Sequence, residues 1–566
     1  MKTFFKSVVV VAAVVAVLVW YFFIPSAPPQ HRIFVNGQVL SMDGDGSIFQ
    51  ALSVRGERID QLGSDEDIMA LADGNTIVTD LQGQTLMPGF VDAHGHFPGS
   101  GMGVVFVDLN SPPIGTVHSI AELQERLRAN LSGKDDDKLL GGFGYDDTLL
   151  AENRHPTRDD LDAVSTAVPI YIMHVSGHMG VGNSRMLELL SIDADSPDPV
   201  GGVIVRRPGS RVPIGLLEET AHMAVTELML DFSVLDGIRM TVAANEEYLA
   251  QGVTTAQSGG VDKSMASGMA SLSKLNIIEL RLVLFPFYHL LGPDLLSGEF
   301  DPASIESDRV AVGPVKIVAD GSIQGYTGYL SEPYYVPFKG DVTYNGYPAV
   351  PRDDLIKAVA DFHSAGYQLA IHGNGDASID DILDAFELAQ AQHPVDDPRL
   401  ILIHAQMARD DQLVRMKALG VTPSFFSAHT YYWGDRHRDI FMGPERAARM
   451  SPTKSAENIG LRYSVHLDTP VVPMQPLQMV WSTANRISTS GAEIGPEQRV
   501  SVMNALRATT IDAAWQVFQE DRIGSLEPGK LADIIILSGD PLTAEDVRQL
   551  EVVETVIGGR TVYLAE

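Results

Sequence analysis

Short apolar stretches alternate with longer amphipathic ones through the middle of the chain, and this alternation predicts the fold. Helical patterns lie between most of the apolar stretches; residues 353–364, for example, place apolar side chains at helical spacing, and Gly366 is positioned to end the helix. Repeated strand–helix units predict a parallel sheet, and eight of them close most naturally as a (β/α)8 barrel, an α/β fold. The eight predicted strands are Phe90–His94, Val253–Gln257, Ile278–Phe285, Val315–Ala319, Gln368–His372, Leu400–His404, Val421–Phe425 and Arg462–Leu467.

Both ends of the chain have a different pattern, in which short alternating strands are separated by turns. Residues 32–87 contain an Asn36-Gly37 pair that is typical of a hairpin, and residues 531–564 repeat the pattern. We therefore predict one small composite β-sandwich domain, built from residues 31–86 and from residues 505–566, the latter beginning with a terminal helix. The barrel then occupies residues 87–504, and a segment of about 97–245 is interpreted as a lid or subdomain inserted after the first strand.

The first 30 residues are interpreted as a membrane anchor and linker. Lys2 and Lys6 precede an unbroken apolar run, Val8–Ile24, which is at the lower limit of length for a transmembrane helix. Trp20 and Tyr21 stand where interfacial anchors occur. An uncleaved N-terminal helix would place the globular part on the exported side, periplasmic or extracellular. The alternatives are a cleaved signal peptide and a buried core helix, of which the second fits the lysine flank poorly.

The composition excludes several classes of protein. The chain has 41 Lys+Arg against 73 Asp+Glu, a formal net charge of −32, and this opposes binding to nucleic acid because phosphate neutralisation needs a basic surface. It has no cysteine, so disulfides, thiolate metal sites and a cysteine nucleophile are excluded. Any metal site must therefore use histidine, carboxylate or a rarer ligand. The oligomeric state stays open, with a homodimer among the options.

Four predicted strands lead into residues of metal-binding type. His94 and His96 in VDAHGHF lie two residues apart on one face, a spacing that suits two ligands of one ion, although this pair alone is weak evidence. His372 in LAIHGNG and His404 in LILIHAQ end their strands at turns, and Asp468 in SVHLDTP follows the last strand. Because the carboxyl ends of barrel strands form one face, these side chains are predicted to converge there.

Lys316 stands inside a predicted barrel strand, in GPVKIVADG, where its side chain should be largely buried. A buried ammonium group is costly, and burial lowers its pKa. The resulting neutral amine can add CO2 to give a carbamate, an anion that can bridge two cations. The alternative is a lysine that is paired with a nearby carboxylate such as Asp320.

These residues, taken in this order, resemble the amidohydrolase superfamily. The phrases LMPGFVDAHGHF, VKIVADGS, LAIHGNGD, HLDTPVVPMQPL and GSLEPGKLADIIIL are similar to those of amidohydrolase family 3, the branch that includes N-substituted formamide deformylases, and the match runs from about Arg32 to the C-terminus. The resemblance implies a TIM-like barrel with a composite β-domain and two divalent ions, most often zinc, bridged by carboxylated Lys316. It makes His94 and His96 ligands of one ion, and His372 and His404 ligands of the other. Such ligands also accept manganese or iron.

The resemblance also implies a metal-dependent hydrolase acting on a carbon–nitrogen bond other than a peptide bond, in a small amide, N-formyl or N-acyl compound. A metal-bridging hydroxide would attack the acyl carbon, and Asp468, a further metal ligand, would carry the proton to the leaving nitrogen. His466, two residues before it, is interpreted as a support for a ligand. The alternatives are a cyclic amide, carbamate or ester hydrolase with the same site, and a catalytically silent binding protein tethered to the membrane.

Weaker candidates for substrate binding lie in the insertion and after the seventh predicted strand. His178 in SGHMGVGNS resembles a substrate-contacting histidine of the family, and a structural role is its alternative. For the remaining candidates, aromatic packing or another structural role is an equal explanation. These are His429, Trp433 and Asp435 in SAHTYYWGD, and Tyr145 in GFGYDD.

Overall fold

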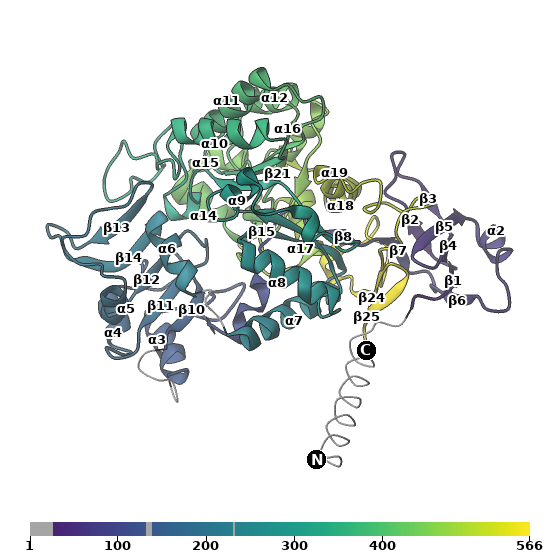
Figure 1. Cartoon of the computed structure of the whole chain (residues 1–566), viewed down its shortest axis with the longest axis horizontal. Helices are drawn as coiled ribbons and strands as arrows, with labels where there is room; N and C mark the ends of the chain where they lie inside the picture. Colours follow the sequence, from purple (N-terminus) through teal and green to yellow (C-terminus); the bar gives the residue numbers. More distant parts are fainter. Residues whose placement is uncertain (1–26, 132–137, 230–232) are drawn as a thin grey trace, which may run out of the picture.

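The computed structural model describes residues 27–131, 138–229 and 233–566. Figure 1 shows a central barrel, an inserted sheet on one side of it and a β-domain formed by both ends of the chain on the other side. The predicted membrane anchor falls on residues 1–26 and lies outside the described residues. Within the described ranges, no helix combines the length and the apolar character needed to cross a membrane.

The predicted barrel is confirmed. Its strands belong to two parallel sheets, with the orders β17-β16-β15-β8 and β18-β19-β20-β21-β22, where β17 (Val310–Val312) is a short additional strand. The other eight are β8 (Phe90–Val91), β15 (Val253–Val261), β16 (Arg281–Pro286), β18 (Val315–Val318), β19 (Leu369–Gly373), β20 (Leu400–His404), β21 (Val421–Phe425) and β22 (Ser464–Val465). A bridge between Phe287 and Lys316 joins the sheets at one seam, and the Asp468 N–H donates to the His94 carbonyl at the other, with 3.2 Å between N and O. Both seams therefore pass through predicted metal ligands.

The helices between these strands pack their apolar faces on the barrel. In α10 (Arg352–Ser364), Leu355, Val359 and Phe362 are buried, and Gly366 follows the helix end with a left-handed φ of 84°, as the helical pattern predicts. The remaining helices of this layer are α7 (Val234–Ala250), α8 (Lys263–Lys274), α9 (Gly292–Ser297), α11 (Asp376–Gln392), α12 (Asp410–Leu419), α16 (Thr453–Asn458), α17 (Pro476–Asn485), α18 (Val502–Ala508) and α19 (Ile511–Gln516). The loop after β21 contains the short helices α13 (His429–Tyr432), α14 (Gly434–Arg436) and α15 (Gly443–Ala448).

The long segment after β8 forms a six-stranded sheet of its own, in the order β13-β14-β12-β11-β10-β9. Its core joins sheet residues such as Leu140, Ile170 and Val181 to Leu123 and Leu127 of α3. Helix α7, at the predicted end of the insertion, packs on both units: Ala244 and Tyr248 belong to the barrel core, whereas Met240 shares a buried cluster with Tyr171 and Val225 of the inserted unit. The strands are β9 (Val107–Asp108), β10 (Leu140–Tyr145), β11 (Ile170–His174), β12 (Met179–Gly182), β13 (Gly202–Arg206) and β14 (Pro213–Glu219), and the helices are η1 (Gly99–Val104), α3 (Ile120–Ala129), α4 (Arg158–Asp162), α5 (Ser184–Leu189) and α6 (Thr220–Met229).

The two ends of the chain meet in one β-domain. It has a sheet of order β5-β4-β1-β6 and a sheet of order β25-β24-β23-β7-β2-β3, in which β7 from the N-terminal part pairs antiparallel with β23 from the C-terminal part. Phe34 and Leu52 of the first sheet share a buried cluster with Leu86 and Ile534 of the second. The elements are β1 (His31–Val35), β2 (Gln38–Leu40), β3 (Ile48–Phe49), β4 (Ala51–Arg55), β5 (Arg58–Gly63), α2 (Asp65–Met69), β6 (Ile77–Asp80), β7 (Thr85–Pro88), β23 (Ile534–Leu537), β24 (Val552–Ile557) and β25 (Arg560–Leu564).

A buried ion pair ties the barrel to this β-domain. Arg281 begins β16 and Asp533 precedes β23; Arg281 Nε lies 2.6 Å from Asp533 Oδ2, and Nη2 lies 3.0 Å from Oδ1. Only 10% of the arginine side chain and 3% of the aspartate side chain are exposed. Removing one partner of such a pair leaves the other charge buried without its counter-ion.

Arg281→Ala is therefore expected to lower the free energy of unfolding by about 3–5 kcal/mol. Urea denaturation followed by circular dichroism measures this loss. Lys357→Ala is the matched control, because that lysine is 74% exposed and pairs with Asp361 four residues along α10, an arrangement worth about 0.3–0.5 kcal/mol. Equal, small losses in both variants would contradict a stabilising role for the Arg281–Asp533 pair.

Candidate metal centre

The six predicted ligands lie together at one end of the barrel. His404 is the last residue of β20, His372 lies in β19 and Lys316 in β18, while His94 and Asp468 follow β8 and β22; all five are buried. The sixth, His96, exposes 44% of its side chain and lines the same cavity as the other five. The barrel topology thus brings together side chains that are as much as 374 positions apart, from His94 to Asp468.

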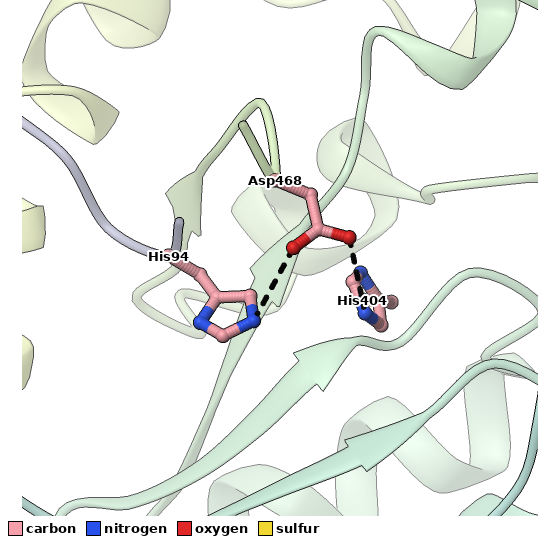
Figure 2. Close-up of side chains that lie close together, drawn as sticks. All are labelled: His94, His404 and Asp468. Carbon is pink, nitrogen blue, oxygen red and sulfur yellow. Dashed lines mark ion pairs between the residues drawn. The ribbon is translucent and has the colours of Figure 1, made fainter. Parts of the chain in front are cut away.

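Asp468 lies at the centre of this group. Its Oδ1 is 3.4 Å from His94 Nε2 and 3.2 Å from His96 Nε2, and its Oδ2 is 3.9 Å from His404 Nε2. Figure 2 shows the carboxylate between the imidazoles of His94 and His404, and the ligand atoms of these three residues all lie within 4.8 Å of one another. Burial opposes ionisation of Asp468, but the surrounding imidazoles hold the pKa of its carboxyl well below the usual range. The group is therefore a carboxylate at neutral pH.

The polar atoms of this cluster are left unsatisfied in a way that fits a divalent cation. Asp468 Oδ1, which faces the Nε2 atoms of His94 and His96, is buried and has no hydrogen-bond partner. Most buried polar atoms in proteins are hydrogen-bonded, so an unsatisfied carboxylate oxygen among imidazoles needs an explanation. Imidazole nitrogens and carboxylate oxygens are the ligands that zinc and similar ions prefer. The residues present therefore fit a metal centre.

Lys316 lies beside the same ligands. Its Nζ is 3.0 Å from His94 Nε2. Burial lowers the pKa of Lys316 to about 7, against the attraction of Asp468. An amine with this pKa is neutral for a large part of the time at physiological pH, as its place in a barrel strand predicts. Asp320, the alternative partner, is engaged elsewhere: its carboxylate accepts backbone N–H groups from Tyr329, Asn374 and Gly375.

Two of the predicted ligands are oriented by polar neighbours. His372 Nδ1 lies 3.2 Å from Asp320 Oδ1. His404 Nδ1 lies 3.0 Å from His466 Nε2, and the other nitrogen of His466 lies 2.9 Å from Ser424 Oγ. Partners of this kind determine which ring nitrogen of a histidine faces a metal ion. The expected support role of His466 agrees with this geometry.

The backbone at the site departs from regular strand geometry. His404 and Asp468 have left-handed φ values of 70° and 57°, a region that residues other than glycine seldom occupy. Residues held in such conformations cluster at functional sites, where the surrounding structure compensates for the strain. Gly259 leaves room for the ring of His94, because a Cβ atom there would lie 2.4 Å from His94 Cε1. The site is thus built by local distortions at strand ends.

A cavity of about 340 Å³ opens from these ligands toward the inserted sheet. All six predicted ligands line it, together with His178. Glu219 is fully buried, and its Oε2 lies 2.9 Å from His178 Nδ1. The rings of His178 and His372 have centroids 5.0 Å apart. Of the five predicted substrate residues, His178 is therefore the one that the structure places in the cavity.

The other four predicted substrate residues are not among those that line this cavity. His429 packs between the rings of Phe426 and Trp433, with its Nδ1 3.2 Å from His437 Nε2. The remaining contacts are equally structural: Trp433 Nε1 donates to Asp146, Asp435 accepts from Ser490, and the Tyr145 hydroxyl lies 3.1 Å from His155 Nδ1. In the structure, neighbouring side chains hold these four residues outside the lining of this cavity, and contact with substrate stays a prediction for them.

The sequence reasoning missed three features of the site. Asp320 lies two residues beyond β18 and was considered only as a partner of Lys316, although the rule that picked out the residues at strand ends would also have placed it at the site. Glu219, by contrast, meets His178 only through pairing of β14 with β12. The methionines that line the cavity come from separate segments with no common pattern along the chain.

Known proteins resemble this chain over most of its length. A model described as "Amidohydrolase family" matches residues 78–563. The chain is 27% identical over 535 residues to an N-substituted formamide deformylase of Arthrobacter pascens. The aligned region covers 93% of this chain and 97% of that protein.

Two solved structures resemble the whole described architecture. A metal-dependent hydrolase of Pyrococcus furiosus is 26% identical to this chain, and the two structures superimpose with a TM-score of 0.69. The superposition covers 91% of this chain and 100% of that one. A second one, from Pyrococcus horikoshii OT3, shares 25% identity and a TM-score of 0.72, covering 91% and 99%. The likeness therefore extends over the barrel, the insertion and the β-domain together.

Proposed function

This chain belongs to the amidohydrolase family, hydrolases that act on carbon–nitrogen bonds other than peptide bonds, and on that premise we propose that it cleaves an amide, N-formyl or N-acyl bond in a metal-dependent reaction. The observation that carries the proposal is the convergence of four imidazoles, one buried amine and one carboxylate on a single cavity. The similarity to an N-substituted formamide deformylase supports the choice of bond.

Two divalent ions, most often zinc in this family, are proposed to bind at the cluster. His94 and His96 would hold one ion, His372 and His404 the other, and Lys316, as its carbamate, would contact both. When bound, such ions polarise a carbonyl oxygen and lower the pKa of a coordinated water. The low pKa of Lys316 supports carbamate formation, because CO2 reacts with the neutral amine.

Asp468 is proposed to move the proton during hydrolysis. Its carboxylate is ionised at rest and faces the centre of the ligand cluster, so it can accept a proton from the attacking water. The tetrahedral carbon then loses its bond to nitrogen, and Asp468 returns the proton to that nitrogen, which leaves as an amine. His178 lines the same cavity, and the buried Glu219 fixes its ring orientation, so it is proposed to contact the substrate carbonyl or its developing charge.

Metal analysis combined with hydrolysis tests the proposal. The purified protein is expected to contain at least one divalent ion per chain and to hydrolyse members of a panel of N-formyl and N-acyl amines. Dialysis against a chelator should lower the rate by about tenfold or more, because the polarising charge is lost, and zinc or manganese should restore it. Buffer dialysed without chelator is the control. A protein that binds metal but cleaves nothing in a broad panel, cyclic amides and esters included, would contradict hydrolysis.

A further inference from the structure

Methionine side chains form much of the cavity wall that faces the candidate metal centre. Five of the chain's 20 methionines line it, and each comes from a different element: Met102 from η1, Met173 from β11, Met223 from α6, Met240 from α7 and Met265 from α8. The inserted unit supplies three of them and the barrel helices supply two. Such a concentration around one cavity points to a ligand that contacts thioethers.

The rest of this wall is also apolar. Phe143, Val175, Phe287, Leu290 and Val471 line the same cavity. Methionine is unbranched and polarisable, so a wall of this kind adjusts to hydrocarbon groups of different shapes. A cavity of about 340 Å³ has the size of an ordinary small-molecule site.

The wall offers no ionic partner to a charged substituent. Among the described residues that line the cavity, Lys316 and Asp468 are the only Lys, Arg, Asp or Glu side chains, and both lie in the ligand cluster. Two of the cavity histidines already have a carboxylate partner: His174 Nε2 lies 3.2 Å from an Asp147 oxygen, and His178 Nδ1 lies 2.9 Å from Glu219 Oε2. His289 packs edge-on against Phe287, with ring centroids 4.6 Å apart. A charge brought into such surroundings loses its hydration without compensation.

From this wall, and resting on the proposed hydrolysis, we propose that the natural substrate carries a neutral hydrocarbon substituent, alkyl or aryl, next to the bond that is cleaved. The substituent packs among the five methionines while the carbonyl carbon lies at the ligand cluster. Amides whose substituent ends in a carboxylate or an ammonium group are excluded. Because methionine adapts to shape, the discrimination is by charge rather than by branching.

A matched pair of substrates tests this selectivity on the metal-loaded protein. N-(6-methylheptyl)formamide and N-formyl-6-aminohexanoate share the reacting bond and a five-carbon spacer, and their ends have similar shapes but differ in charge. We expect kcat/KM for the neutral member to exceed that of the carboxylate by about 100-fold or more, the scale set by an unpaired buried charge. N-Heptylformamide and N-benzylformamide should differ from the neutral member by less than about tenfold. Isothermal titration of the same compounds into the Asp468→Asn variant, which is expected to turn over slowly, measures binding with little interference from hydrolysis.

A variant that weakens the preference tests the methionine wall itself. Met223→Lys places an ammonium group among the methionines and is expected to raise kcat/KM for N-formyl-6-aminohexanoate, relative to the neutral partner, by about tenfold or more. Met173→Lys serves as the second variant if the first does not fold. Met69→Lys is the matched control, because Met69 is 42% exposed on α2 in the β-domain, and its selectivity should equal that of the unchanged protein.

The outcomes separate this inference from the proposed function. Equal rates and equal binding for the charged and neutral members, or a preference for the charged one, would overturn the apolar substrate. Tighter binding of the neutral member without any cleavage would support the apolar site and contradict hydrolysis. Cleavage with the expected preference, reduced by the lysine variant, supports both.

Discussion

Replacing Lys316 with alanine is expected to reduce turnover by about 10³-fold or more and to lower the metal content of the purified protein. The side chain is buried, its Nζ lies 3.0 Å from His94 Nε2, and burial brings its pKa to about 7. If the amine carries CO2 as a carbamate, alanine removes an anionic ligand from the centre of the cluster. The imidazoles of His94 and His404 are neutral, because burial keeps their pKa values well below the usual value. Neutral ligands balance the positive charge of a cation much less than an anionic carbamate does.

A short carboxylic acid should restore part of the activity of this variant. Acetate or propionate fits the space that the lysine side chain leaves and supplies a carboxylate where the carbamate would be. The measurements are kcat with and without the acid, and metal content by atomic emission. Lys357→Ala, on the exposed face of α10, is the control for loss of a lysine and should remain fully active. Full activity and full metal content in Lys316→Ala would exclude the bridging carbamate.

Asp468→Asn is expected to lower kcat by about 10²–10⁴-fold, the range for loss of a general acid–base group. The amide keeps the size of the side chain and one oxygen that can still contact a cation, but it cannot accept a proton. Metal content should therefore fall far less than turnover. The reason lies in the position of Asp468, whose oxygens face His94, His96 and His404 at 3.2–3.9 Å.

The ratio of the two losses is the informative quantity for Asp468. Metal content and kcat measured on the same preparation give it directly, and circular dichroism verifies the fold. Asp439→Asn serves as the control, since that carboxylate is 57% exposed and pairs with Arg438 outside the cavity. Turnover at the level of the unchanged protein would remove Asp468 from proton transfer, and equal loss of metal and turnover would make it a ligand alone.

The barrel was predictable because parallel strands that are covered on both faces consist almost entirely of apolar residues. The predicted strands Leu400–His404 and Val421–Phe425 coincide with β20 and β21. Agreement is poorer where the chain turns into the site: the prediction Phe90–His94 is reduced to Phe90–Val91, and Arg462–Leu467 to Ser464–Val465. At these two places the backbone stops pairing with the neighbouring strand before it reaches His94 or Asp468. The left-handed φ at Asp468 could not be predicted from the residue type.

The substrate side of the site was much less predictable. His178 was found because its motif resembles one of the family, whereas Trp433 and Tyr145 were chosen only for their aromatic character next to a predicted active face. In the structure, Trp433 donates to Asp146 and joins the loop after β21 to the insertion, whereas Tyr145 contacts His155 within the insertion. Whether an aromatic residue faces a cavity or a neighbour depends on packing between distant segments, which no local pattern records.

The amino-acid sequence alone determined the barrel, the joining of both chain ends in one domain and the set of six side chains that meet at the candidate metal centre. These follow from short-range rules: apolar periodicity defines a strand, and the end of a parallel strand defines the face on which its last side chain lies. Only the tertiary structure decided that Asp320 orients His372 instead of pairing with Lys316, that Glu219 supports His178, and that five methionines line one cavity. Such contacts arise where separate sheets and helices pack against each other. Close packing depends on the shape and volume of the side chains and not on their positions along the chain.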